Sequence, residues 1–98
     1  MPDESWYERM LSQFREKLDC IDKEIAELII QRLDISKQIG TEKKHNGWSA
    51  PTDKTREEAV IANVCAYASD SQYKETLKNI YEVIISEGKK YQDRIINE

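Results

Sequence analysis

The sequence predicts an all-α chain of three helices in the order long, short, long. Only three Gly and two Pro occur in 98 residues, too few for the many turns that a β-sandwich or barrel needs. Apolar residues recur at steps of three and four over most of the chain, which is the period of an amphipathic helix. A chain of this length makes one domain, so we expect a single domain over residues 1–98.

The first predicted helix covers residues 5–44, a segment without Pro and with one Gly. Its apolar residues form a heptad seam: Leu11, Phe14, Leu18, Ile21, Ile25, Leu28, Ile35 and Ile39. At 1.5 Å per residue, about 40 residues span roughly 60 Å, whereas a compact domain of about this size has a radius of gyration near 13 Å. The helix is too long for its own domain, so we expect a second copy to cover it in an antiparallel or intertwined homodimer.

Two further helices are predicted after a loop at residues 45–53, where Asn, Gly, Ser and Pro gather. Thr55 and Glu58 have the spacing of a capping box at the start of the second helix, and Asp53 and Thr52 are alternative N-caps. The polar residues 69–71 predict its end. The third helix follows, and its apolar stripe extends from Tyr73 to Ile95.

Charge and composition exclude several classes of function. The net charge is −4 and no basic block is present, which argues against a protein that tracks nucleic-acid phosphates. The chain starts with acidic and polar residues and has no apolar run near 18 residues, so we expect a cytoplasmic protein that is neither secreted nor membrane-spanning. Cys20 and Cys65 follow no metal or redox spacing, and we interpret them as reduced core residues.

Arg32 stands in the apolar seam of the first helix. A guanidinium taken out of water is costly unless it is paired. It therefore either meets an acid inside a helical bundle, or reaches the surface where the seam opens, or awaits an anionic ligand.

Two other cations relate to the same seam. Lys43 falls on the face of Arg32, although a lysine in the last turn also complements the helix dipole. Arg15 flanks the seam and lies about 26 Å from Arg32 along one helix. In an antiparallel dimer, however, Arg15 of one chain can approach Arg32 of the other, which would make a composite site.

The later helices contribute five more candidate residues. Gly88 interrupts an apolar stripe, which indicates close helix packing or space for a ligand. Gln92 presents an amide one turn further on. Asp53, Arg56 and Glu57 cluster at the start of the second helix, where capping explains one of them but not all three.

Neither a nucleophile relay nor a metal-ligand spacing nor a nucleotide-binding fingerprint is found in the sequence. The unusual residues are instead cations and an amide, directed into a helical bundle. This set suits a small dianion that reacts without acid–base or covalent help.

The chain resembles the all-helical chorismate mutases of the AroQ class over nearly its whole length. The resemblance is carried by five stretches in the family's order: residues 14–22, 27–32, 39–43, 53–57 and 84–92. It implies an intertwined homodimer that converts chorismate to prephenate without a cofactor, on the shikimate route to Phe and Tyr.

The resemblance also implies a role for each candidate residue. Arg32 of one chain and Arg15 of the other would bind the two carboxylates of the substrate, while Lys43 and Gln92 would donate to its ether oxygen. Asp53 and Glu57 would engage the region of the ring hydroxyl, with Arg56 beside the ligand. At Gly88 the family usually has Ser, so a hydrogen bond to a substrate carboxylate is lost or passed to water, and weaker binding is expected.

Two other functions are compatible with the pattern. An isochorismate-pyruvate lyase uses similar residues, but such lyases tend to lack an acid at the position of Glu57. A non-catalytic helical dimer, with Arg32 in a buried salt bridge, explains the seam but not the combined placement of Lys43, Glu57 and Gln92.

Overall fold

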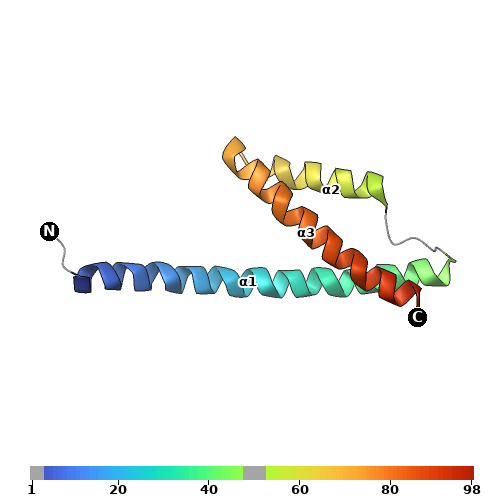
Figure 1. The fold of residues 1–98 in the computed structure, drawn as a ribbon, viewed down its shortest axis with the longest axis horizontal. Helices are drawn as coiled ribbons and strands as arrows, with labels where there is room; N and C mark the ends of the chain where they lie inside the picture. The colour runs from blue at the N-terminus through green and yellow to red at the C-terminus, as the bar shows by residue number, and fades with distance from the viewer. Residues whose placement is uncertain (1–3, 48–52) are drawn as a thin grey trace. The chain divides into compact units, whose positions relative to one another are not determined.

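The computed structural model describes residues 4–47 and 53–98. Its three helices are α1 (Glu4–His45), α2 (Lys54–Ala66) and α3 (Ser71–Ile96) (Figure 1). The predicted all-α class and the long, short, long order are confirmed. The loop predicted at residues 45–53 falls largely on residues 48–52, which lie outside the described residues.

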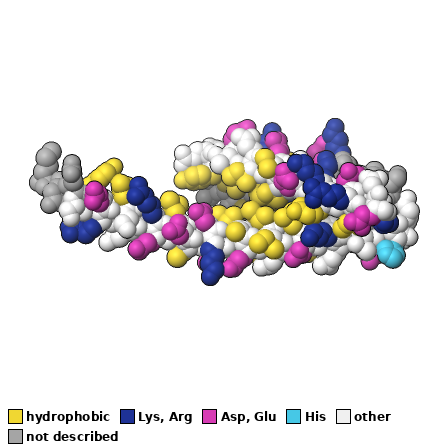
Figure 2. All heavy atoms as spheres, turned by 60° about the horizontal axis from the view of Figure 1, so that its bottom comes forward, with side chains coloured by type: hydrophobic (Ala, Val, Ile, Leu, Met, Phe, Trp, Pro, Cys, Tyr) yellow, Lys and Arg dark blue, Asp and Glu magenta, His cyan; other side chains and the backbone are white. Residues whose placement is uncertain are grey.

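The chain divides into two compact units, Met1–Gln31 and Arg32–Glu98. The first is the N-terminal part of α1, and its seam is open: Phe14, Leu18 and Ile21 are each at least half exposed. Apolar side chains reach the surface of both units (Figure 2), and no apolar residue in the described parts of the chain is fully buried. An isolated chain therefore leaves uncovered the apolar surface that the predicted homodimer would bury.

Within the second unit, α3 folds back against α2. Asp53 is the N-cap of α2, and its carboxylate accepts a hydrogen bond of 3.0 Å from the backbone N–H of Arg56. The capping box predicted from Thr55 is therefore wrong, because Thr55 lies inside the helix and the preceding Asp53 supplies a charged acceptor. The alternative N-cap, Asp53, is confirmed.

The connection between α2 and α3 comes earlier in the chain than the sequence pattern indicated. The helix α2 ends at Ala66, with Tyr67 as its C-cap. The predicted terminator at residues 69–71 already contains the start of α3, since the side chain of Asp70 caps that helix by accepting from the backbone N–H of Gln72 at 3.0 Å. The same polar residue types end one helix and begin the next, so the pattern does not separate the two roles.

Gly40 allows α1 and α3 to approach closely within the second unit. A Cβ at this position would lie 2.9 Å from Cα and 3.3 Å from the carbonyl oxygen of Gln92. These are backbone atoms, which cannot rotate away as a side chain can. The absence of a side chain at Gly40 thus brings the last turns of α1 against the part of α3 that carries Gln92.

Both cysteines are free thiols, but Cys20 is exposed and Cys65 is half-buried. The expectation of a core position is wrong for Cys20 in the single chain, because its part of α1 is exposed. In the described residues, no helix is long and apolar enough to cross a membrane.

Candidate functional site

A pocket of about 380 Å³ opens within the second unit. It lies among the C-terminal part of α1, the start of α2 and the C-terminal half of α3, and its volume is within the range of small-molecule sites. The predicted site residues, apart from Arg15, all line it: Arg32, Lys43, Asp53, Arg56, Glu57, Gly88 and Gln92. Arg15 belongs to the first unit and is not among the lining residues, so its predicted role, as a residue supplied by a partner chain, stays a prediction.

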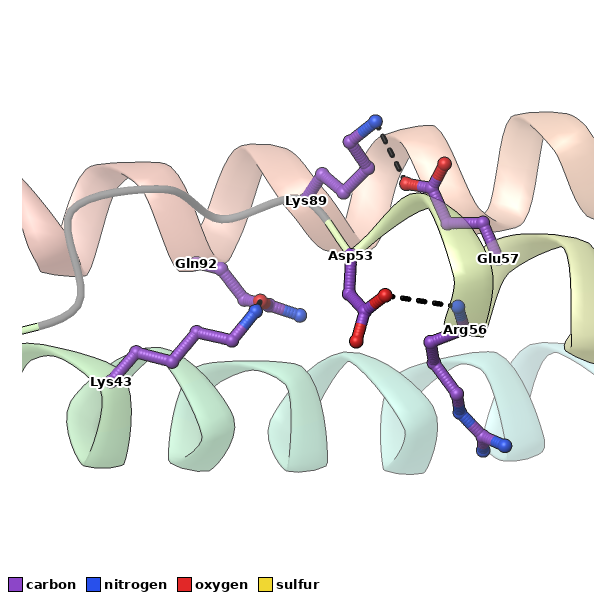
Figure 3. A network of polar contacts seen from close by, with 6 residues as sticks. All are labelled: Lys43, Asp53, Arg56, Glu57, Lys89 and Gln92. Atoms are coloured by element: carbon purple, nitrogen blue, oxygen red, sulfur yellow. Dashed lines mark hydrogen bonds and ion pairs between the residues drawn. The ribbon is translucent and has the colours of Figure 1, made fainter.

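Lys43 and Gln92 meet across the pocket from α1 and α3 (Figure 3). The Lys43 Nζ donates a hydrogen bond of 3.0 Å to Gln92 Oε1. Because this bond uses the amide oxygen, it orients the carboxamide and leaves the Nε2 hydrogens as donors. An ammonium and an amide N–H are thereby held side by side, an arrangement suited to an electron-rich oxygen.

Arg32 lies on α1, is half-buried and lines the pocket. Its Cζ lies 5.9 Å from the centre of the Tyr81 ring, the distance of a cation–π contact. Among the residues that the structure describes, it forms no ion pair. The buried salt bridge considered as an explanation for this residue is therefore not formed within the described chain.

The start of α2 contributes an acidic side to the pocket. Glu57 pairs with Lys89 of α3, with 2.8 Å between Oε1 and Nζ (Figure 3), and the side chains are 24% and 34% exposed. The enclosed Oε1 has this close ion pair with Lys89 and makes no other contact with a donor in the described residues. Lys89 was not predicted as a site residue, because its partner Glu57 lies on a different helix and the sequence does not show which helices meet.

Gly88 is buried and lines the pocket, so close packing and space beside the pocket, the two alternatives considered for it, both apply. A Cβ built there would lie 2.9 Å from the Oγ of Ser36 on α1. Ser36 lines the pocket and is 5% exposed, yet it was not predicted as a site residue. Its spacing of four residues from Arg32, on the same helix face, was the available signal.

The apolar lining and the charges of the pocket indicate which kind of ligand it can bind. The apolar lining consists of Ile35, Ile39, Val60 and Ile85. Four cationic side chains face the pocket against two acidic ones, although the whole chain carries a net charge of −4. No cluster of potential metal ligands occurs in residues 4–47 and 53–98. The site suits a small anionic ligand with an apolar face.

A protein-family model matches most of the chain. The model of the family described as Chorismate mutase type II covers residues 14–93, which includes all the predicted site residues. No curated protein and no solved structure matched the chain.

Proposed function

Because the chain belongs to the Chorismate mutase type II family, we propose that it catalyses the rearrangement of chorismate to prephenate. The observation that carries this proposal is the hydrogen-bonded pair of Lys43 and Gln92 in a pocket that also holds Arg32. The reaction breaks a C–O bond and forms a C–C bond within one molecule. It moves no proton and needs no nucleophile, so the protein has to supply only shape and charge.

Lys43 and Gln92 act on the ether oxygen of the substrate. Negative charge develops on this oxygen as its bond breaks, and two preorganised donors stabilise it more in the transition state than in the ground state. Their mutual hydrogen bond of 3.0 Å holds both groups in place before the substrate arrives. This preorganisation avoids the cost of orienting donors during the reaction.

Arg32 binds one substrate carboxylate, and Arg15 of the partner subunit binds the other. Two guanidiniums at fixed positions select the compact conformer in which the reacting carbons are close, which is catalysis by orientation. The exposed seam of α1 supports the intertwined homodimer that this arrangement requires.

Asp53 and Glu57 lie on the side of the substrate that carries the ring hydroxyl, with Arg56 beside them. The carboxylate of Glu57 lines the pocket and is an acceptor for a ligand hydroxyl. The ammonium of Lys89, 2.8 Å from Glu57 Oε1, compensates the negative charge of Glu57 when the pocket binds a dianion.

The first test is the loss of chorismate absorbance with purified protein and no added metal or cofactor. We expect conversion at enzymic rates, with the product identified as prephenate by its acid conversion to phenylpyruvate. A folded dimer without turnover would contradict the proposal, and pyruvate release from isochorismate would then indicate a lyase.

Thermal unfolding of the Arg32→Leu variant distinguishes a ligand-binding role of Arg32 from a structural role in a non-catalytic helical dimer. A partly buried arginine whose ligand is absent destabilises the folded protein. We therefore expect Arg32→Leu to leave the midpoint of thermal unfolding unchanged or to raise it. The same substitution should abolish turnover. A large fall in that midpoint would instead support a structural role in a helical dimer.

A further inference from the structure

Ser36 is the one buried polar side chain in the described parts of the chain, and it lines the pocket. A serine within a helix commonly bonds its hydroxyl to the carbonyl four residues earlier, as Thr41 does here with Lys37 at 3.1 Å. In residues 4–47 and 53–98, the Ser36 hydroxyl makes no such bond. The Ser36 oxygen is not among the fully enclosed side-chain atoms that lack a partner in these residues, so it is accessible from the pocket and can donate to a bound ligand.

Gly88 creates the space into which this hydroxyl reaches. The point where a Cβ of residue 88 would stand lies 2.9 Å from Ser36 Oγ and 3.7 Å from Nη1 of Arg32. The hydroxyl and the guanidinium therefore border the same small space, and both come from one face of α1. A hydroxyl beside an arginine is a typical second donor to a carboxylate.

We infer that Ser36 is a substrate-binding residue, whose hydroxyl donates a hydrogen bond to the substrate carboxylate held by Arg32. The inference rests on the proposed function. The family resemblance implies that Gly88 removes a hydroxyl from α3 and weakens binding, whereas Ser36 supplies a hydroxyl to the same space from α1. A Cβ at residue 88 would stand 2.9 Å from Ser36 Oγ, so a side chain there would require the hydroxyl to leave its present position.

The test moves the hydroxyl from one helix to the other. We expect Ser36→Ala to lower kcat/KM by about 10- to 100-fold, the effect of losing a hydrogen bond to a charged group. Most of the loss should appear in KM, because the carboxylate is charged in both the ground state and the transition state. The double variant Ser36→Ala/Gly88→Ser should recover at least half of this loss on a logarithmic scale. A serine side chain fits at residue 88 in this double variant, since its Cβ would lie 3.7 Å from the Cβ of residue 36, an ordinary van der Waals contact.

Two matched controls isolate the hydroxyl. Ser36→Ala/Gly88→Ala differs from the swapped variant by one oxygen atom, and we expect it to stay as impaired as Ser36→Ala. Thr41→Ala removes a hydroxyl from the exposed face of the same helix, and we expect it to keep the KM of the unmodified protein. Thermal unfolding of every variant reports whether a kinetic change follows from loss of structure.

The outcomes separate the inference from the proposed function. An unmodified protein that does not convert chorismate would overturn both. An active protein whose Ser36→Ala variant keeps its KM, or whose swapped variant recovers no more than the alanine control, would overturn the inference alone. If Ser36→Ala does not fold, Ser36→Cys retains a side chain of similar size with a weak donor, and an unchanged KM in that variant would equally contradict the role of Ser36.

Discussion

Lys43 and Lys44 are adjacent cations at the end of α1, but their surroundings differ. Lys43 Nζ donates to Gln92 Oε1 in the pocket, whereas Lys44 Nζ donates to the backbone carbonyl of Glu98 at 2.6 Å, outside it. The two residues have the same charge and nearly the same position along the helix. They therefore form a matched pair for separating transition-state stabilisation from general electrostatics.

We predict that Lys43→Ala lowers kcat by about 10²- to 10³-fold, the effect of removing one preorganised donor from a developing anion. Steady-state kinetics with chorismate would measure this change, and circular dichroism would show that the variant is folded. Lys44→Ala should keep kcat within about twofold, since surface substitutions have small effects. Similar losses in both variants would attribute the effect to net charge and contradict a specific role for Lys43.

Gln92 offers a test through pH. An amide does not titrate, so its donors are present at any pH, whereas a glutamate at this position donates only when protonated. We predict that Gln92→Glu is nearly inactive at neutral pH, because a carboxylate repels the developing negative charge, and that its kcat rises as the pH falls. A pH profile of kcat for both proteins would measure this, and a flat, low profile for the variant would contradict donation from residue 92.

At the scale of the elements, the two N-caps permit a similar comparison. Asp53 caps α2 and lines the pocket, while Asp70 caps α3 and is not among the pocket residues. Removing either capping side chain leaves a backbone N–H without its acceptor. The loss of a cap and the loss of a site residue can thus be measured separately.

We predict that Asp53→Ala and Asp70→Ala each lower the free energy of unfolding by about 1 kcal/mol, and that only the first raises KM for chorismate. Asp53→Ser retains a capping oxygen without the charge, so its stability should stay close to that of the unmodified protein. Urea unfolding and steady-state kinetics would measure the two effects. Equal kinetic constants for Asp53→Ala and Asp70→Ala would show that Asp53 does not contribute to substrate binding.

The helices also show why a glycine inside a helix need not indicate flexibility. Gly40 and Gly88 both lie in helix interiors, where glycine costs about 1 kcal/mol relative to Ala. Each permits a close approach: Gly40 faces the backbone at Gln92, and Gly88 faces the side chain of Ser36. The first contact brings two helices together, and the second shapes the pocket.

At the scale of the whole molecule, the proposed site needs residues from two chains. The pocket in Arg32–Glu98 contains the other predicted residues, while Arg15 belongs to Met1–Gln31. The exposed apolar seam of that first unit is the surface that a second copy would cover. If each site combines Arg32 of one chain with Arg15 of the other, two inactive variants can complement each other.

We predict that Arg15→Ala and Arg32→Ala are each inactive alone, and that dimers reassembled from an equal mixture recover about a quarter of the activity of the unmodified protein. Half of the dimers are then mixed, and one of the two sites in each mixed dimer has both arginines. Chorismate turnover after mild unfolding and reassembly would measure this recovery. A mixture that stays inactive after demonstrated subunit exchange would place both arginines in one chain or remove Arg15 from the site.

The sequence by itself determined the class and the order of the helices, because the apolar period is a local property and only three glycines and two prolines interrupt it. It also indicated seven of the residues that line the pocket, since charged and amide side chains on an apolar helix face need an explanation. The N-cap of α2 was left open, because Asp53, Thr52 and Thr55 are all suitable by type, and only the hydrogen bond of Asp53 to the Arg56 backbone distinguishes them.

Only the tertiary structure decided which side chains meet. The pairs Lys43–Gln92, Glu57–Lys89 and Ser36–Gly88 each join two helices, and their distances depend on how closely those helices approach. The absence of a side chain at Gly40 permits this close approach, and the periodicity of one helix carries no information about it. Ser36 and Lys89 can therefore be identified as site residues only from the tertiary structure, because their neighbours, Gly88 and Glu57, lie on other helices.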